Sequence, residues 1–230
     1  MILSHRHGFI FLKTAKTAGT SVEIALSRHA GSQDIITPIS ASDENLRKEW
    51  GGRGPQNYRL PLRNLTARQL AGMALTFRRP GFYNHMPAAE VRQLAGESVW
   101  KSSFRFCIER NPFDRVVSLY WWCHRREPRP SISEFLRSPH LQLLTKNGIE
   151  MYTDSAGGIL VDQILRYEQL DEDLEHVRLK LGLPEPLTLP RAKGGHRPEH
   201  QSWRDVLSPA DRQLVEKQFR RELELFGYEW

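Results

Sequence analysis

The 230-residue sequence contains only two cysteines, Cys107 and Cys123. Two thiols are too few for a disulfide framework or a cysteine-rich zinc site, and Cys107 lies in an apolar segment where we expect a small core residue. No apolar run approaches the ~18 residues of a membrane span, and residues 1–7 lack the pattern of a signal peptide. We therefore expect a cytoplasmic protein with no membrane span and no metal site.

Acidic residues are the minority charge, with 27 Asp and Glu against 33 Lys and Arg and a formal net charge of +6. This excess suits an anionic ligand, but the arginines are dispersed among loops and do not form the basic and aromatic motif of a known nucleic-acid reader. We expect no nucleic-acid partner and keep a basic nucleic-acid-binding module as an alternative. The 39% hydrophobic content is enough for the core of one domain, residues 1–230.

One strand, loop and helix near the N-terminus organises the sequence. Residues 9–12 are four large apolar residues, which predict a strand buried on both faces, and helical spacing begins at Val22. The first N–H groups of a helix have no intrahelical partner, and the helix dipole adds partial positive charge there. The junction between strand and helix therefore predicts an anion-binding site.

The loop at this junction carries suitable side chains. Lys16 supplies a full positive charge, and Gly19 lets the backbone approach a ligand closely. The hydroxyl groups of Thr17, Thr20 and Ser21 can donate hydrogen bonds to phosphate or sulfonate oxygens. An alternative interpretation is a capping box between Thr20 and Glu23 on an ordinary amphipathic helix.

The loop is not a Walker A motif, because its lysine precedes the glycine instead of following it. The order Lys16-Thr17-Ala18-Gly19-Thr20-Ser21 resembles the 5′-phosphosulfate loop of sulfotransferases that use 3′-phosphoadenosine 5′-phosphosulfate (PAPS). The resemblance is to the branch with Golgi carbohydrate sulfotransferases and their bacterial relatives, although Ala15 stands where that family usually has proline. It implies that residues 16–21 bind the PAPS phosphosulfate and that Lys16 stabilises the leaving phosphate.

A second strand and helix follow at residues 104–120. Asn111 is a good N-cap and Pro112 suits the first helical position, so the helix start is strongly marked. The pattern Arg-x-Pro-x-x-Arg-x-x-Ser resembles the second signature of the same family. It implies that Arg110 and Ser118 hold the 3′-phosphate of PAPS.

His85 lies after an expected strand end and before a helix that we expect to begin at Pro87 and end near Gly96. In the resembled family, a histidine in this setting is the general base, and an imidazole near its free pKa suits that role at neutral pH. His196, His200 and Glu23 are the rival candidates.

The segment Arg166-Tyr167-Glu168 also resembles the family and implies that Arg166 and Tyr167 order the cofactor site, with a strand-end pair of Arg166 and Glu168 as the alternative. Residues 31–66 read as a long loop, which is a candidate wall of the acceptor site, with a mobile surface loop as the alternative. Residues 187–203 read as a basic loop, and the resemblance implies that such a loop near the C-terminus lies over the nucleotide. We further expect a helix from 66, two short helices within 131–146, a strand within 159–168, a helix at 171–181 and a last helix from 208 to 226.

Strands that alternate with helices predict an α/β fold, a P-loop-like open parallel sheet with helices on both faces and the site at the carboxyl edge. The resemblance implies an in-line transfer of a sulfuryl group from PAPS to an acceptor hydroxyl, a carbohydrate by first preference. The sulfonate carries a single charge, so we expect no metal requirement. The alternative enzyme is a P-loop kinase with Glu109 as its Walker B carboxylate, which would need magnesium.

Overall fold

The structure, a computed structural model, describes residues 1–77, 79–192, 197 and 201–230, with the side chains of residues 64, 68, 69 and 76 left out. Its strands form one sheet in the order β3-β1-β2-β4-β5. They are β1 (Ile2–Ser4), β2 (Phe9–Phe11), β3 (Ile35–Ile36), β4 (Phe104–Glu109) and β5 (Gln163–Arg166). Strands β2, β4 and β5 run parallel, whereas β1 is antiparallel to β2 and β3. The predicted α/β open sheet is confirmed, and β1 and β3 extend its parallel part with antiparallel strands.

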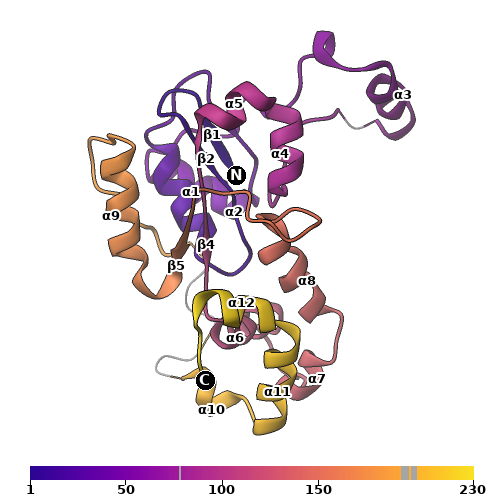
Figure 1. The fold of residues 1–230 in the computed structure, drawn as a ribbon, viewed down its shortest axis with the longest axis vertical. Helices are drawn as coiled ribbons and strands as arrows, with labels where there is room; N and C mark the ends of the chain where they lie inside the picture. Colours follow the sequence, from indigo (N-terminus) through magenta and orange to yellow (C-terminus); the bar gives the residue numbers. More distant parts are fainter. Residues whose placement is uncertain (78, 193–196, 198–200) are drawn as a thin grey trace.

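Helices cover both faces of this sheet, as predicted (Figure 1). Because side chains alternate along a strand, Phe9 and Phe11 pack on one face with α1 (Gly19–Ser27) and α9 (Leu170–Lys180). Ile10 and Leu12 pack on the other face with α4 (Ala88–Ala95), α5 (Glu97–Ser102) and η2 (Ile149–Met151). All four side chains are buried, which confirms a strand segment enclosed on both faces.

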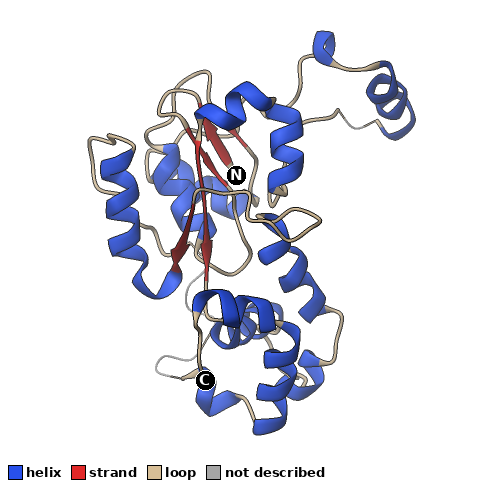
Figure 2. Cartoon of the chain, viewed as in Figure 1, coloured by secondary structure: helices blue, strands red, loops and turns tan. Residues whose placement is uncertain are grey.

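A group of helices beyond the carboxyl end of β4 has its own core (Figure 2). It consists of α6 (Pro112–Cys123), α7 (Ile132–Leu136), α8 (His140–Lys146), α10 (Trp203–Val206), α11 (Pro209–Gln218) and α12 (Arg220–Phe226). The marked start of α6 is confirmed, because the Asn111 side chain accepts a hydrogen bond from the Phe113 N–H at 3.0 Å. The two short helices predicted within 131–146 are α7 and α8.

Two predicted segments need correction. Residues 31–66 are not one long loop, because they contain β3, α2 (Ala41–Glu49) and the 3-10 turn η1 (Leu62–Asn64). The buried residues of α2 are Asp43 and Arg47, so this helix has no apolar periodicity to reveal it. The last predicted helix is two helices, because Phe219 (φ −113°) leaves the helical conformation between α11 and α12.

One helix stands apart from the body of the molecule. The predicted helix from residue 66 is α3 (Ala67–Thr76), and Figure 1 shows it at the end of an extended segment, which we call the arm (residues 59–81). Its base is closed where Arg59 pairs with Gly81 and the Leu60 N–H donates to the Pro80 carbonyl at 3.0 Å. Within the described residues, the helices are all too short or too polar to cross a bilayer.

Candidate active site

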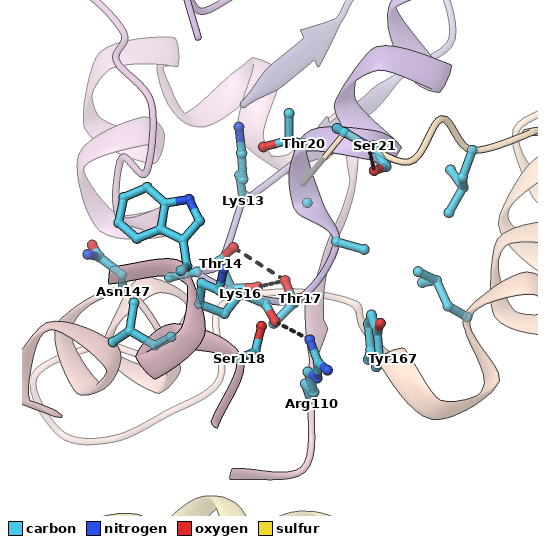
Figure 3. A pocket seen from close by; sticks show the side chains of 18 of the residues that line it. Lys13, Thr14, Lys16, Thr17, Thr20, Ser21, Arg110, Ser118, Asn147 and Tyr167 are labelled. Carbon is cyan, nitrogen blue, oxygen red and sulfur yellow. Dashed lines mark hydrogen bonds between the residues drawn. The ribbon is translucent and has the colours of Figure 1, made fainter. Parts of the chain in front are cut away.

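A cavity of about 840 Å³ lies where β2 and β4 end. This volume is typical of a site for a small molecule. Except for Arg166, every residue that the sequence predicts for catalysis or cofactor binding contributes to its lining: Lys16, Thr17, Ala18, Gly19, Thr20, Ser21, His85, Arg110, Ser118 and Tyr167. Residues separated by about 150 positions in the sequence are thus brought around one cavity (Figure 3).

The loop before α1 has an unusual backbone. Lys16 and Ala18 adopt left-handed conformations, with φ of 64° and 59°, which residues other than glycine rarely do. Alternating backbone conformations of this kind turn successive N–H groups into a concave anion site. The N-cap of α1 is Ala18, which makes no side-chain cap bond, so the capping box between Thr20 and Glu23 is wrong. The start of α1 therefore keeps its N–H groups for a ligand.

Two arginines of the second strand–loop–helix unit, which consists of β4 and α6, fix the backbone of this loop. Arg115 is completely buried, donates to the Ala15 carbonyl at 2.9 Å and pairs with Glu109 at 2.8 Å. Arg110 donates to the Lys16 carbonyl at 3.1 Å (Figure 3). Both contacts reach the loop backbone, so the conformation of the loop depends on the second unit while its own side chains face the cavity.

Arg110 is itself firmly oriented. Its guanidinium donates to Asp114 at 2.8 and 2.5 Å and lies 3.9 Å from the ring centre of Tyr167. Burial alone would raise the pKa of Asp114, but Arg110 and Arg197 lower this pKa and keep the carboxylate ionised. Figure 3 shows Ser118 beside Arg110. Asp114 takes two of the five N–H donors of the guanidinium and the Lys16 carbonyl takes a third, so Arg110 retains two donors for a phosphate.

Glu23 lies in a buried ion cluster behind the cavity. Its carboxylate is 2.9 Å from Lys13 Nζ, 3.2 Å from Arg47 and 3.1 Å from the Met1 amine. Burial alone would raise the pKa of Glu23, but the charges of the Met1 amine, Lys13 and Arg47 lower it to about 2. Such a weakly basic carboxylate is a poor proton acceptor at neutral pH, and it does not line the cavity. Glu23 is therefore a structural residue and not a rival for the base.

His85 has a defined tautomer. Its Nδ1 lies 2.8 Å from the Lys13 carbonyl oxygen, which can only accept, so Nδ1 carries the proton and Nε2 keeps a lone pair. Burial, followed by the charge of Lys13, lowers the pKa of His85 to about 4. His85 also has a positive φ of 56°, so it is a third residue of the cavity lining with left-handed backbone, after Lys16 and Ala18. The imidazole is thus neutral and able to accept a proton at physiological pH.

Arg166 is the predicted site residue that the structure places elsewhere. Its guanidinium donates to the Phe226 carbonyl at 2.9 Å and lies 5.7 Å from the ring centre of Tyr228. Glu168 instead accepts from the Asn111 N–H at 2.7 Å and from the Tyr228 hydroxyl at 3.0 Å. Both residues tie the end of β5 to other segments, so neither the cofactor role of Arg166 nor its pairing with Glu168 agrees with the geometry.

Glu109, the carboxylate on which the kinase alternative rests, is completely buried. It pairs with Arg115 and accepts a hydrogen bond from the Tyr152 hydroxyl at 2.8 Å. It does not line the cavity and has no open oxygen to offer a magnesium ion there. Among the residues that the structure describes, no group of three His, Cys, Asp or Glu side chains is arranged to hold a metal.

Of the two loops expected around the site, only the one at residues 187–203 contributes to the described cavity lining. None of the described residues from 31–66 lines the cavity, so the structure does not place the candidate acceptor wall there. Arg191 and Ala192 of the 187–203 loop do line it, and the Ala192 N–H donates to Ser21 Oγ at 3.4 Å. The rivals His196 and His200 lie outside the described residues.

Several residues of the site were not identified from the sequence. Lys13 lines the cavity and holds both Glu23 and His85, but its position directly after a strand gave no distinct signal. Trp122 also lines the cavity, and Lys16 Nζ lies 5.3 Å from its ring centre. Arg115 did carry a signal, since it is the second arginine of the Arg-x-Pro-x-x-Arg-x-x-Ser pattern, and the structure shows that it is buried.

Comparison with known proteins decides the family. A family model described as the sulfotransferase family matches residues 1–229. The chain belongs to the sulfotransferase family. An uncharacterized protein of Archaeoglobus fulgidus is 36% identical to this sulfotransferase over 106 residues, which are 44% of this chain and 87% of that protein.

Among solved structures, the crystal structure of a sulfotransferase from Alicyclobacillus acidocaldarius is similar over 97% of this chain and 96% of its own chain. The identity is 16% and the TM-score is 0.42, so this likeness carries no argument about individual residues of the site. Membership of the family agrees with the resemblance seen in residues 16–21 and 110–118 and makes a sulfuryl transfer the activity to consider.

Proposed function

We propose that this sulfotransferase moves a sulfuryl group from PAPS to an acceptor hydroxyl by in-line displacement. The observation that carries the proposal is the pairing of two features in one cavity. One is an anion-binding loop with Lys16 at the start of α1, and the other is a neutral imidazole with an open Nε2. An in-line displacement needs both, because negative charge grows on the leaving phosphate while the attacking hydroxyl must lose a proton.

The residues of the cavity suit the donor. The N–H groups and hydroxyls of residues 16–21 would hold the 5′-phosphosulfate, and Lys16 would stabilise the negative charge on the leaving oxygen. Arg110 and Ser118 would hold the 3′-phosphate, since Asp114 orients a guanidinium that keeps free donors. Tyr167, against which Arg110 packs, would fix that end of the site.

His85 supplies the base in this proposal. The acceptor oxygen forms a bond to sulfur, the bond between sulfur and the phosphate oxygen breaks, and the acceptor proton passes to Nε2 of His85. The products are the sulfated acceptor and 3′-phosphoadenosine 5′-phosphate. The Lys13 carbonyl holds the Nδ1 proton and so keeps Nε2 as the accepting nitrogen.

A carbohydrate is the acceptor that we propose. Trp122 offers an apolar ring face and Asn147 an amide group in the same lining, and a sugar presents both apolar faces and hydroxyls. We assign the protein to the cytoplasm, because its two free cysteines suit a reducing compartment.

The test is incubation of the full chain with PAPS labelled in the sulfonate and a panel of sugars, phenols and aliphatic alcohols. We expect label on a sugar hydroxyl, with transfer unaffected by a chelator. Transfer only to phenols would contradict the carbohydrate assignment. Release of label to water alone, or a strict need for magnesium and ATP, would contradict the reaction itself.

A further inference from the structure

The net charge of the chain comes from one segment. Residues 50–89 contain six of the 33 basic residues and none of the 27 acidic residues. The other 27 basic residues equal the 27 acidic residues in number, so the formal excess of +6 equals the charge of this segment. All six basic residues are arginines: Arg53, Arg59, Arg63, Arg68, Arg78 and Arg79. The guanidinium fork binds phosphate oxygens in a bidentate manner, which a lysine cannot do.

The arm within this segment also exposes large apolar side chains. Leu75 is 82% exposed and Phe77 is 92% exposed, and Leu62 and Leu70 are 54% and 42% exposed. Leu70 and Leu75 belong to α3, which projects from the body in Figure 1. Several highly exposed large apolar side chains within one short segment indicate an interaction surface.

We propose that the arm docks on an anionic lipid surface. Leucine and phenylalanine side chains enter the boundary between headgroups and acyl chains, while arginines bind the lipid phosphates. Exposed apolar residues and arginines both occur in the arm. The segment contains no acidic residue that could neutralise the charge of the arginines. A second copy of the chain fits less well, because its arm would bring an equal positive charge to the contact.

The base of the arm is close in sequence to the cavity lining. The chain runs from Gly81 at the base of the arm to His85 in the cavity lining within four residues. The proposal does not depend on the reaction, since it rests on the charge and exposure of the arm. Its test therefore uses binding and not activity.

The experiment is co-sedimentation of the full chain with vesicles of phosphatidylcholine alone or mixed with phosphatidylglycerol, at low and high salt. We expect binding to the anionic vesicles only, and weaker binding at high salt. The double variant Leu75→Ser and Phe77→Ser should reduce the binding at least about tenfold, because it removes apolar burial. Its control is Leu179→Ser with Leu225→Ser, which changes two exposed leucines outside the arm.

A second pair of variants tests the charge. Arg59→Gln with Arg63→Gln should weaken the binding about tenfold, whereas Lys101→Gln with Lys217→Gln, outside the arm, should change it little. Circular dichroism establishes that each variant is folded. Equal binding to neutral vesicles, or equal losses in arm and control variants, would overturn the proposal.

Two further outcomes would replace it. A dimer in sedimentation velocity that the arm variants abolish, without vesicle binding, would make the arm a self-association surface. Binding of single-stranded DNA that depends on the arginines but not on Leu75 and Phe77, again without vesicle binding, would make it a nucleic-acid surface.

Discussion

The molecule contains two units of strand, loop and helix that differ in how the helix begins. In the first unit, α1 follows β2, and its N-cap residue Ala18 makes no side-chain cap bond. In the second unit, α6 follows β4, and Asn111 and Pro112 cap its start. The first helix therefore keeps its N–H groups for a ligand, whereas the second satisfies one of them internally and has no N–H on Pro112.

This difference indicates a division of labour. In the proposed reaction, the first unit would present backbone N–H groups and Lys16 where charge changes, and its Lys13 carbonyl accepts a hydrogen bond from His85. The second unit contributes oriented side chains, Arg110 and Ser118, and holds the loop of the first. Variants of the first unit and of His85 should therefore lower turnover, and variants of the second should lower cofactor affinity.

The largest expected effect belongs to His85. The variant His85→Ala should lose roughly 10²–10⁴-fold in kcat, while the affinity for 3′-phosphoadenosine 5′-phosphate stays within a few-fold. Because burial and the charge of Lys13 lower the pKa of His85 to about 4, its neutral form predominates above that pH. The activity should thus rise around pH 4 and be level near pH 6.5, where an ordinary histidine titrates.

The measurement is the pH dependence of kcat for the wild type and the variant. His140→Ala is the control, because His140 is exposed and does not line the cavity. A rise in activity centred near pH 6.5 would mean that another group limits the reaction, and full activity of His85→Ala would exclude it as the base.

Lys16 should show the next largest effect. Lys16→Ala should lower kcat by roughly 10²–10³-fold, as does the removal of one group that stabilises transition-state charge. The left-handed Lys16 backbone can accommodate alanine at a similar cost, so the fold should persist. Steady-state kinetics measures the loss, with Lys101→Ala, an exposed site on α5, as control. Near-normal turnover by the folded variant would contradict the proposal that Lys16 of the first unit stabilises the leaving phosphate.

Arg110 should affect affinity more than turnover. Charge-assisted contacts to a phosphate contribute about 1.5–3 kcal/mol, so Arg110→Ala should weaken binding of 3′-phosphoadenosine 5′-phosphate roughly tenfold to a hundredfold. Binding of adenosine 5′-phosphosulfate, which lacks the 3′-phosphate, should hardly change. Calorimetry with both ligands measures the difference, and Arg220→Ala on α12 is the control. Equal losses for both ligands would give Arg110 a different role, such as support of the Lys16 backbone.

The sequence predicted the two units well because their signals are local. An apolar strand followed by a loop with Lys16 and Gly19, and a capped helix start at Asn111 and Pro112, are both readable within a few residues. Except for Arg166, the predicted site residues line the cavity. Arg166 failed because its direction at the end of β5 depends on Phe226 and Tyr228, which are about 60 residues away.

The contacts that the sequence did not reveal are buried and charged. Glu23 forms ion pairs with Lys13 and with Arg47 of α2. A charged residue in a helix without apolar periodicity is ordinarily taken as solvent-exposed, so the burial of Arg47 was not expected. Asp114 also lies in the first turn of a helix, and its role in orienting Arg110 was not identified from the sequence. The pairing of Glu23 with Arg47 is decided by the packing of two helices, which residue spacing does not encode.

The smallest expected effect tests whether the cap of the second unit is structural alone. The Asn111 side chain bonds the Phe113 N–H at 3.0 Å and does not line the cavity. Asn111→Ala should therefore lower the free energy of unfolding by about 0.5–2 kcal/mol and leave kcat and cofactor affinity unchanged. Urea unfolding measures the stability, and Ser208→Ala is the matched control, because Ser208 caps α11 through the Asp211 N–H at 3.2 Å. If Asn111→Ala instead weakened cofactor binding while Ser208→Ala did not, the start of α6 would take part in holding Arg110, and the two units would share the binding task.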